Sequence, residues 1–233
     1  MATKKNQRIR LFNEVLEKSS MKQDVFAAVL KSFQLMKQVS EVLAKDYQIN
    51  AIKKKMDRHD LLSVDQHGDF EFALQFGGDT LLFLMHTNIF EIPRDHNVMR
   101  SKYIQEDPTR SYCGIVHIYN FLTDSFKYNR VNDLGYLIGR IFINREQHYF
   151  IDGKSELGFM YNNFRNHQIN EKNVEEILLS AIRYTLGFDL LIPPYEQVKL
   201  LTVSEMKNAL EVISFKTGKR LGFQFYADQD EVE

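Results

Sequence analysis

Two carboxylates and a histidine are the side chains of this sequence with the clearest potential for chemistry. Asp69 and Glu71 lie two positions apart in a run that alternates apolar and polar residues, so a strand would place both on one face. A hairpin that turns at Gly77-Gly78 would bring His86 opposite Asp69. Such a trio could bind a divalent cation or do acid–base work, which defines one alternative function, a divalent-metal-dependent hydrolase or nuclease. We prefer the simpler interpretation, the polar end of a hairpin, because strand ends commonly carry charged residues that face water.

A basic cluster formed by Lys53, Lys54, Lys55 and Arg58 could contact a phosphate. The run contains no interleaved aromatic residues, however, and cations at the C-terminal end of a helix are favoured by the helix dipole. The whole chain has 30 Lys and Arg against 31 Asp and Glu, so it lacks the electrostatic footprint of a nucleic-acid-binding protein. We therefore expect a solvated helix end here, and no nucleic acid as a partner.

The remaining residues give no complete catalytic or metal-binding motif. The seven histidines show neither His-x3-His nor His-Glu-x-x-His spacing, and we predict neither a metal nor a cofactor. Gly153-Lys154-Ser155 resembles the end of a phosphate-binding loop, but the required glycine five residues earlier is His148. Cys113 is the single cysteine, which excludes an intramolecular disulfide framework.

Aromatic residues with basic neighbours form a further pattern in the middle of the chain. A sheet face of this kind can bind single-stranded nucleic acid by stacking, but aromatic residues are also ordinary strand formers, and we prefer a packing role. The tyrosines concerned are Tyr112, Tyr119, Tyr128, Tyr136 and Tyr149.

An antiparallel sheet over residues 69–161 must position these side chains. The alternation over residues 69–76, followed by the glycine pair, predicts a hairpin in which Phe72 faces Phe83 and Leu74 faces Leu81. One face of that hairpin would be buried. Its predicted members are Phe70, Phe72, Leu74, Leu81, Phe83 and Met85.

Two amphipathic helices are predicted before the sheet, over residues 6–19 and 22–56, with an interruption at Ser19-Ser20. An unbroken second helix would be about 50 Å long, whereas a domain of this size has a radius of gyration of about 17 Å. It must therefore kink, stop near residues 48–50, or project and pack against another chain. We predict a homodimer whose interface includes Phe33, Met36 and Val39, since a two-fold contact is the commonest way to cover such a stripe.

The C-terminal part is predicted to be helical, with a helix over residues 171–186 capped by Asn170, a last helix after Thr202 and a possible strand over residues 221–226. Strands grouped between helices indicate the α+β class. We expect one domain, 1–233, with an N-terminal helical segment 1–60, the sheet 69–161 and a C-terminal segment 170–233. The long irregular stretch 93–111 is of the kind that often carries function.

Composition places the chain among ordinary soluble proteins, with 44% apolar and 26% charged residues. The basic N-terminus has no apolar signal core behind it, and no uncharged run is long enough to span a bilayer, so we expect a cytoplasmic protein without a membrane partner. The sequence favours a non-catalytic binding module that self-associates.

Overall fold

The computed structural model describes residues 2–54, 62–153 and 163–187, together with the pairs 190–191, 202–203 and 218–219. Its strands are β1 (Ser63–Gln66), β2 (Glu71–Phe76), β3 (Asp79–Met85), β4 (Phe90–Glu91), β5 (Tyr112–Leu122), β6 (Tyr136–Asn144), β7 (Tyr149–Gly153), β8 (Leu190–Leu191) and β9 (Gly218–Lys219). Its helices are α1 (Ala2–Lys53), α2 (Lys102–Glu106), α3 (Thr123–Lys127) and α5 (Glu171–Leu186), with 3-10 turns η2 (Asn97–Arg100) and η3 (Pro108–Ser111).

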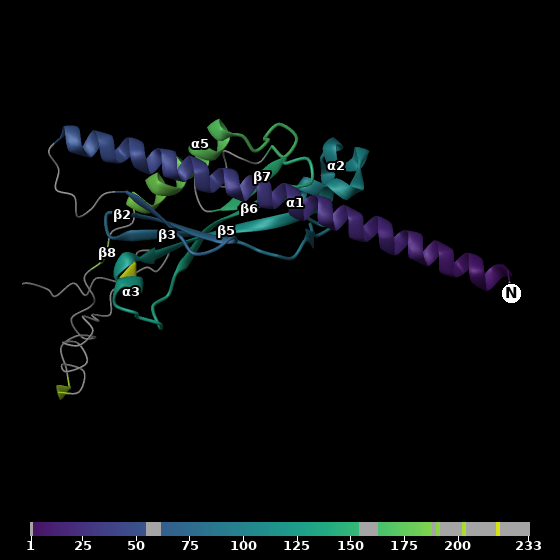
Figure 1. Ribbon diagram of the computed structural model, residues 1–233, viewed down its shortest axis with the longest axis horizontal. Helices are drawn as coiled ribbons and strands as arrows, with labels where there is room; N and C mark the ends of the chain where they lie inside the picture. The colour runs from purple at the N-terminus through teal and green to yellow at the C-terminus, as the bar shows by residue number, and fades with distance from the viewer. Residues whose placement is uncertain are drawn as a thin grey trace, which may run out of the picture.

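A single antiparallel sheet forms the centre of the molecule (Figure 1). Its seven strands follow the order β1-β2-β3-β5-β6-β7, with β4 also paired to β5, while β8 and β9 form a separate pair. Helices precede and follow the sheet, which confirms the predicted α+β class.

The β2–β3 hairpin has the predicted register, with Phe72 opposite Phe83 and Leu74 opposite Leu81. Gly77 and Gly78 make the turn with φ angles of 53° and 84°, a region of backbone space that favours glycine. The predicted buried face is confirmed except at one position. Phe70 is 37% exposed, because it lies in a bend before β2 begins.

The N-terminal region is one continuous helix of 52 residues, α1, and the predicted interruption at Ser19-Ser20 is wrong. Exposed serines lower helix propensity only slightly, and no glycine or proline occurs before Gly68 to break the chain. At about 1.5 Å per residue α1 is about 78 Å long, so it extends well beyond the sheet (Figure 1). No helix in the described part of the chain combines the length and apolar character needed to cross a bilayer.

The main core lies between one face of the sheet and two helices, the middle of α1 and α5. Phe72 stacks on Phe83 with ring centroids 4.5 Å apart and also meets Phe33 of α1 at 5.3 Å. Gly114 of β5 lets α1 approach closely, since a Cβ there would lie 2.6 Å from a methyl group of Val29. The helix and the sheet are therefore in direct contact along the middle of α1.

A second, smaller core covers part of the opposite sheet face. Cys113 and Phe150 point away from α1 there and pack with Tyr103 and Ile104 of α2 and with Phe164. This core holds the segment 92–111 against strands β5–β7, and it sets the geometry of the polar site described below.

The remaining sequence predictions are correct for some elements and wrong for others. Helix α5 begins after the Asn170 cap and ends at Gly187, as predicted. Within the stretch 69–161 predicted as sheet, residues 123–127 form the short helix α3 instead, and the backbone N–H of Tyr128 donates to the Asp124 carbonyl. The sheet also begins earlier than expected, with β1. Residues 154–161, most of the last predicted helix and the predicted strand 221–226 lie outside the described residues.

Candidate functional site

The predicted trio of Asp69, Glu71 and His86 lies at the open end of the β2–β3 hairpin. Asp69 is exposed in the bend before β2, and Glu71 is the first residue of that strand. His86 follows β3, and its Nδ1 accepts a hydrogen bond from the backbone N–H of Asn88 at 3.0 Å. Among the described residues, which include all three, no group of three His, Cys, Asp or Glu side chains is placed to hold a metal ion. The paired ladder stops at Glu71, so Asp69 leaves the strand and the trio does not assemble into a metal site.

The predicted basic cluster is only partly described. Lys53 is the last residue of α1, and Lys54 follows in an exposed turn. Lys55 and Arg58 lie outside the described residues. The two visible lysines stand at a helix C-terminus, where the helix dipole favours cations.

The residues predicted to form a dimer interface lie in the chain's own core. Phe33 and Met36 are 0% and 1% exposed, and Val39 is partly buried against the same cluster. Phe33 also contacts Phe72 of β2. A side chain buried in its own sheet is not available to a second chain, so the prediction is wrong for Phe33 and Met36.

Exposed apolar side chains lie further towards the N-terminus, on the part of α1 that we call the arm, residues 4–20. Every residue of the arm is exposed, and in Figure 1 the purple end of the helix extends away from the sheet. Near the end of the arm, Lys18 makes a cation–π contact with the sheet: its Nζ lies 5.4 Å from the centre of the Tyr112 ring. The large apolar residues of the arm are Ile9 (47% exposed), Leu11 (56%), Phe12 (56%), Val15 (55%) and Leu16 (67%).

The tyrosines of the strands do not form one stacking platform. Tyr149 is completely buried in the main core. Tyr119 stacks against His117 on the opposite face of the sheet, with ring centroids 5.9 Å apart, and the Tyr112 hydroxyl donates to Glu91 at 3.0 Å. These side chains therefore have separate packing roles.

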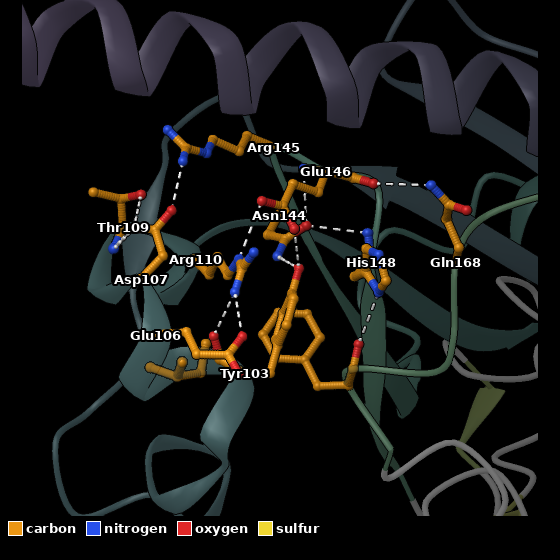
Figure 2. A network of polar contacts seen from close by, with 12 residues as sticks. Tyr103, Glu106, Asp107, Thr109, Arg110, Asn144, Arg145, Glu146, His148 and Gln168 are labelled. Atoms are coloured by element: carbon orange, nitrogen blue, oxygen red, sulfur yellow. Dashed lines mark hydrogen bonds and ion pairs between the residues drawn. The ribbon is translucent and has the colours of Figure 1, made fainter.

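Among the described residues, an extended group of polar contacts is centred on Tyr103 of α2 (Figure 2). The Tyr103 hydroxyl donates to Glu146 Oε2 at 2.6 Å and accepts from Asn144 Nδ2 at 2.9 Å. Arg110 completes the group. Its Nε donates to Glu146 Oε1 at 3.1 Å, its Nη1 donates to the Tyr103 carbonyl at 2.9 Å, and its guanidinium lies 4.3 Å from the centre of the Tyr103 ring.

The turn after β6 supplies the acceptors of this network. Asn144 Oδ1 accepts from the backbone N–H groups of Glu146 and His148, each at 3.0 Å, so its amide is fixed with the nitrogen towards Tyr103. Beside it, Arg145 Nη2 donates to Asp107 Oδ2 at 2.6 Å, as Figure 2 shows. Two charged pairs thus join the segment 102–111 to the β6–β7 turn.

The pKa values of these groups move in the directions that hold the network together. Burial raises the pKa of Tyr103 far above its usual 10, and the hydrogen bond to the Glu146 carboxylate adds to this. Burial alone would raise the pKa of Glu146, but the hydrogen bonds from Tyr103 and Arg110 outweigh it and the pKa is lowered. The hydrogen bond from the Thr109 hydroxyl, with smaller contributions from Arg145, lowers the pKa of Asp107. At neutral pH the network therefore contains a protonated phenol and ionised carboxylates.

The chemistry of the network suits a structural role, in which it joins the segment 102–111 to the β6–β7 turn, better than a reactive one. Tyr103 would be a poor base at neutral pH because its proton is held, and Glu146 is neutralised by Arg110. The irregular stretch 93–111, which the sequence marks as the kind of segment that often carries function, contains Tyr103 and Arg110, but the sequence does not indicate their partners. Tyr103 and Glu146 are 43 residues apart, and no local pattern in the sequence indicates that they meet.

Compared with known proteins, the chain matches no protein-family model, no curated protein and no solved structure.

Proposed function

We propose that this protein is a non-catalytic interaction module that self-associates through the arm of α1. The observation that supports the proposal is a helix with five large apolar side chains, each about half exposed or more, that the described part of the chain leaves uncovered. Large exposed apolar patches on soluble proteins mark interaction sites. Alone in water, a helical segment of this length is marginally stable, so a partner would also stabilise the arm itself.

The apolar residues of the arm form a continuous surface. Ile9, Phe12 and Leu16 follow one another at spacings of three and four, which places them on one side of a helix. Leu11 and Val15 lie on the flank of this surface that continues towards the sheet-facing side of α1. The surface spans residues 9–16, about two helical turns or about 12 Å at 1.5 Å per residue.

The charges of the arm favour a second copy in the antiparallel direction. Its first half carries Lys4, Lys5, Arg8 and Arg10, and the acidic residues Glu14 and Glu17 lie in its second half. A parallel, in-register pair would place the four cations of one arm beside the same four cations of the other. An antiparallel two-fold pair places the basic half of each arm beside the half with the acidic residues, and a two-fold contact uses the same patch on both chains.

The expected dimer is weak and depends on concentration. Burying the exposed half of a large apolar side chain contributes about 1 kcal/mol, so five of them give about 5 kcal/mol per arm. Association costs at least about 4 kcal/mol in lost translational and rotational freedom. We expect micromolar dissociation, with the monomer populated at low concentration.

The test uses two double variants of equal charge. Phe12→Glu with Leu16→Glu places two carboxylates in the apolar surface and should give a monomer. Asn6→Glu with Gln7→Glu adds the same charge on the side of the helix away from Phe12 and should leave the dimer intact. Light scattering over a concentration series measures the mass, which should approach twice 27.5 kDa for the parent and for the control.

A parent that remains monomeric at high concentration would contradict self-association. If the parent were monomeric but bound anionic vesicles, the basic and apolar arm would be a lipid-binding helix instead. The cytoplasm remains the predicted location. The metal-dependent alternative at Asp69 and Glu71 has no supporting observation in the described residues.

A further inference from the structure

A cavity of about 880 Å³ opens beside the Tyr103 network, between the segment 96–103 and the residues around Phe164. Its charged and aromatic lining consists of His96, Arg100, Lys102, Tyr103, Arg165 and His167. The second core forms its base, since Tyr103 and Phe164 are both buried there and their rings meet edge to face at 5.4 Å. The cavity is therefore supported by rigid packing.

The lining is strongly cationic, and its cations are unmatched. Arg100, Lys102 and Arg165 are exposed and form no ion pair with any described residue. None of the described residues that line the cavity is acidic. In a chain whose net charge is −1, three unmatched cations around one cavity are a local concentration of positive charge.

The neighbouring network keeps its own charges out of the cavity. Glu146 and Asp107 do not line the cavity: the Glu146 carboxylate accepts from the Tyr103 hydroxyl and is neutralised by Arg110, and Asp107 is paired with Arg145. These two carboxylates therefore pair with Arg110 and Arg145, not with the cations of the cavity. The positive charge of Arg100, Lys102 and Arg165 is left for a ligand.

We propose that this cavity binds a small phosphorylated organic molecule. Guanidinium groups recognise phosphate by paired hydrogen bonds, and a lysine adds a further point charge. The volume is within the range of sites for ligands of drug size and far exceeds a phosphate group alone, so the ligand includes an organic body. The aromatic base formed by Tyr103 and Phe164 would contact that body.

Polar groups in the lining add specific contacts. His96 Nδ1 accepts from the backbone N–H of Val98 at 3.2 Å, so in the neutral ring the proton is on Nε2, which is left as a donor. Asn97 and Asn163 also line the cavity and can bond to hydroxyl or ring atoms. The site is independent of the arm, so its success or failure does not decide the proposed self-association.

The experiment compares two phosphate esters, adenosine monophosphate and glucose 6-phosphate, with adenosine and glucose by calorimetric titration. At least one ester should bind and raise the melting temperature, and the two uncharged compounds should not. Arg100→Ala and Arg165→Ala should each weaken that binding by about tenfold or more, as expected for the loss of a charge-assisted hydrogen bond. Arg94→Ala is the matched control, because Arg94 is exposed two residues before the segment 96–103 and does not line the cavity.

Each other outcome overturns the proposal. If neither ester binds at millimolar concentration, the cavity has no such ligand. Equal weakening by Arg94→Ala would show a general charge effect, and equal binding of inorganic phosphate would remove the organic body from the argument. Tighter binding of a single-stranded oligonucleotide than of the mononucleotide would make the surface a nucleic-acid site. Lys102→Ala provides a third variant if either arginine variant fails to fold.

Discussion

At the scale of single residues, the hydrogen bond between Tyr103 and Glu146 determines how the segment 102–111 is held. Tyr103 belongs to α2 and Glu146 to the β6–β7 turn. Their hydrogen bond favours the protonated phenol of Tyr103 and the ionised carboxylate of Glu146. Because a depressed carboxyl pKa links folding to ionisation, this pair has a measurable pH signature.

The pH dependence of the unfolding free energy that this pair causes appears below pH 7. The folded-state pKa of Glu146 lies below its unfolded value of about 4.3, so its stabilising contribution is present above that pH and is lost as the pH falls through the folded value. Glu146→Gln should therefore lower the unfolding free energy at pH 7 by about 1–2 kcal/mol, with a difference from the parent that shrinks towards pH 3. Thermal unfolding across this pH range measures both effects.

The matched control for this prediction is Glu106→Gln. Glu106 also pairs with Arg110, at 3.4 Å, but its side chain is 55% exposed, and exposed ion pairs contribute little. Its unfolding curves should follow those of the parent at every pH. A difference between Glu146→Gln and the parent that does not change with pH would show that the carboxylate charge is not what holds the network.

At the scale of elements, the β2–β3 hairpin has a buried ring inside β2 and an exposed ring in the bend just before it. Phe72 is completely buried between Phe33 and Phe83, whereas Phe70 is 37% exposed and its ring meets that of Phe26 edge to face with centroids 6.2 Å apart. Phe72→Ala should cost about 3–5 kcal/mol, as large-to-small core substitutions do. Phe70→Ala removes the same atoms and should cost clearly less.

Urea unfolding of the two variants and the parent tests the assignment of faces. Glu71→Gln, on the other face, should leave the midpoint close to that of the parent. Equal midpoints for Phe72→Ala and Phe70→Ala would mean that the main core does not lie where the register places it.

Features with a local signal could be predicted from the sequence. The glycine pair and the alternation around it give the hairpin register, and Asn170 with Gly187 gives both ends of α5. The spacing of apolar residues also shows that α1 is amphipathic. It does not show which part of the stripe is covered, because the sheet that buries Phe33 comes later in the chain, and this is why the predicted interface is wrong at Phe33 and Met36.

The candidate sites depend on contacts between residues far apart in the sequence, so most of their residues could not be predicted from the sequence. Segment 93–111 could be singled out by its length and irregularity alone. The meeting of Tyr103 with Glu146 requires the β6–β7 turn to fold onto that segment, and the meeting of Arg100 with Arg165 at one cavity requires the residues around Phe164 to do so. Only the three-dimensional arrangement supplies that information.

At the scale of the whole molecule, α1 has two separate roles along its length. Its middle closes the main core, with Val25, Val29 and Phe33 all completely buried. Its first part, the arm, is exposed on all sides. Stability and self-association should therefore be separable by shortening the chain.

Removal of residues 1–17 tests this separation and keeps Lys18, which contacts Tyr112. The shortened protein should be monomeric at every concentration, and its melting temperature should equal that of the parent at low concentration, where the parent dissociates. At high concentration the parent should melt at a higher temperature, since association stabilises the folded state by mass action, and the shortened protein should show no such increase. If the shortened protein is still a dimer, the interface lies elsewhere, and the exposed Val42 and Ile49 on the outer side of α1 are the next residues to change. If it melts below the parent at low concentration, the arm packs against its own body, and the separation of roles along α1 is wrong.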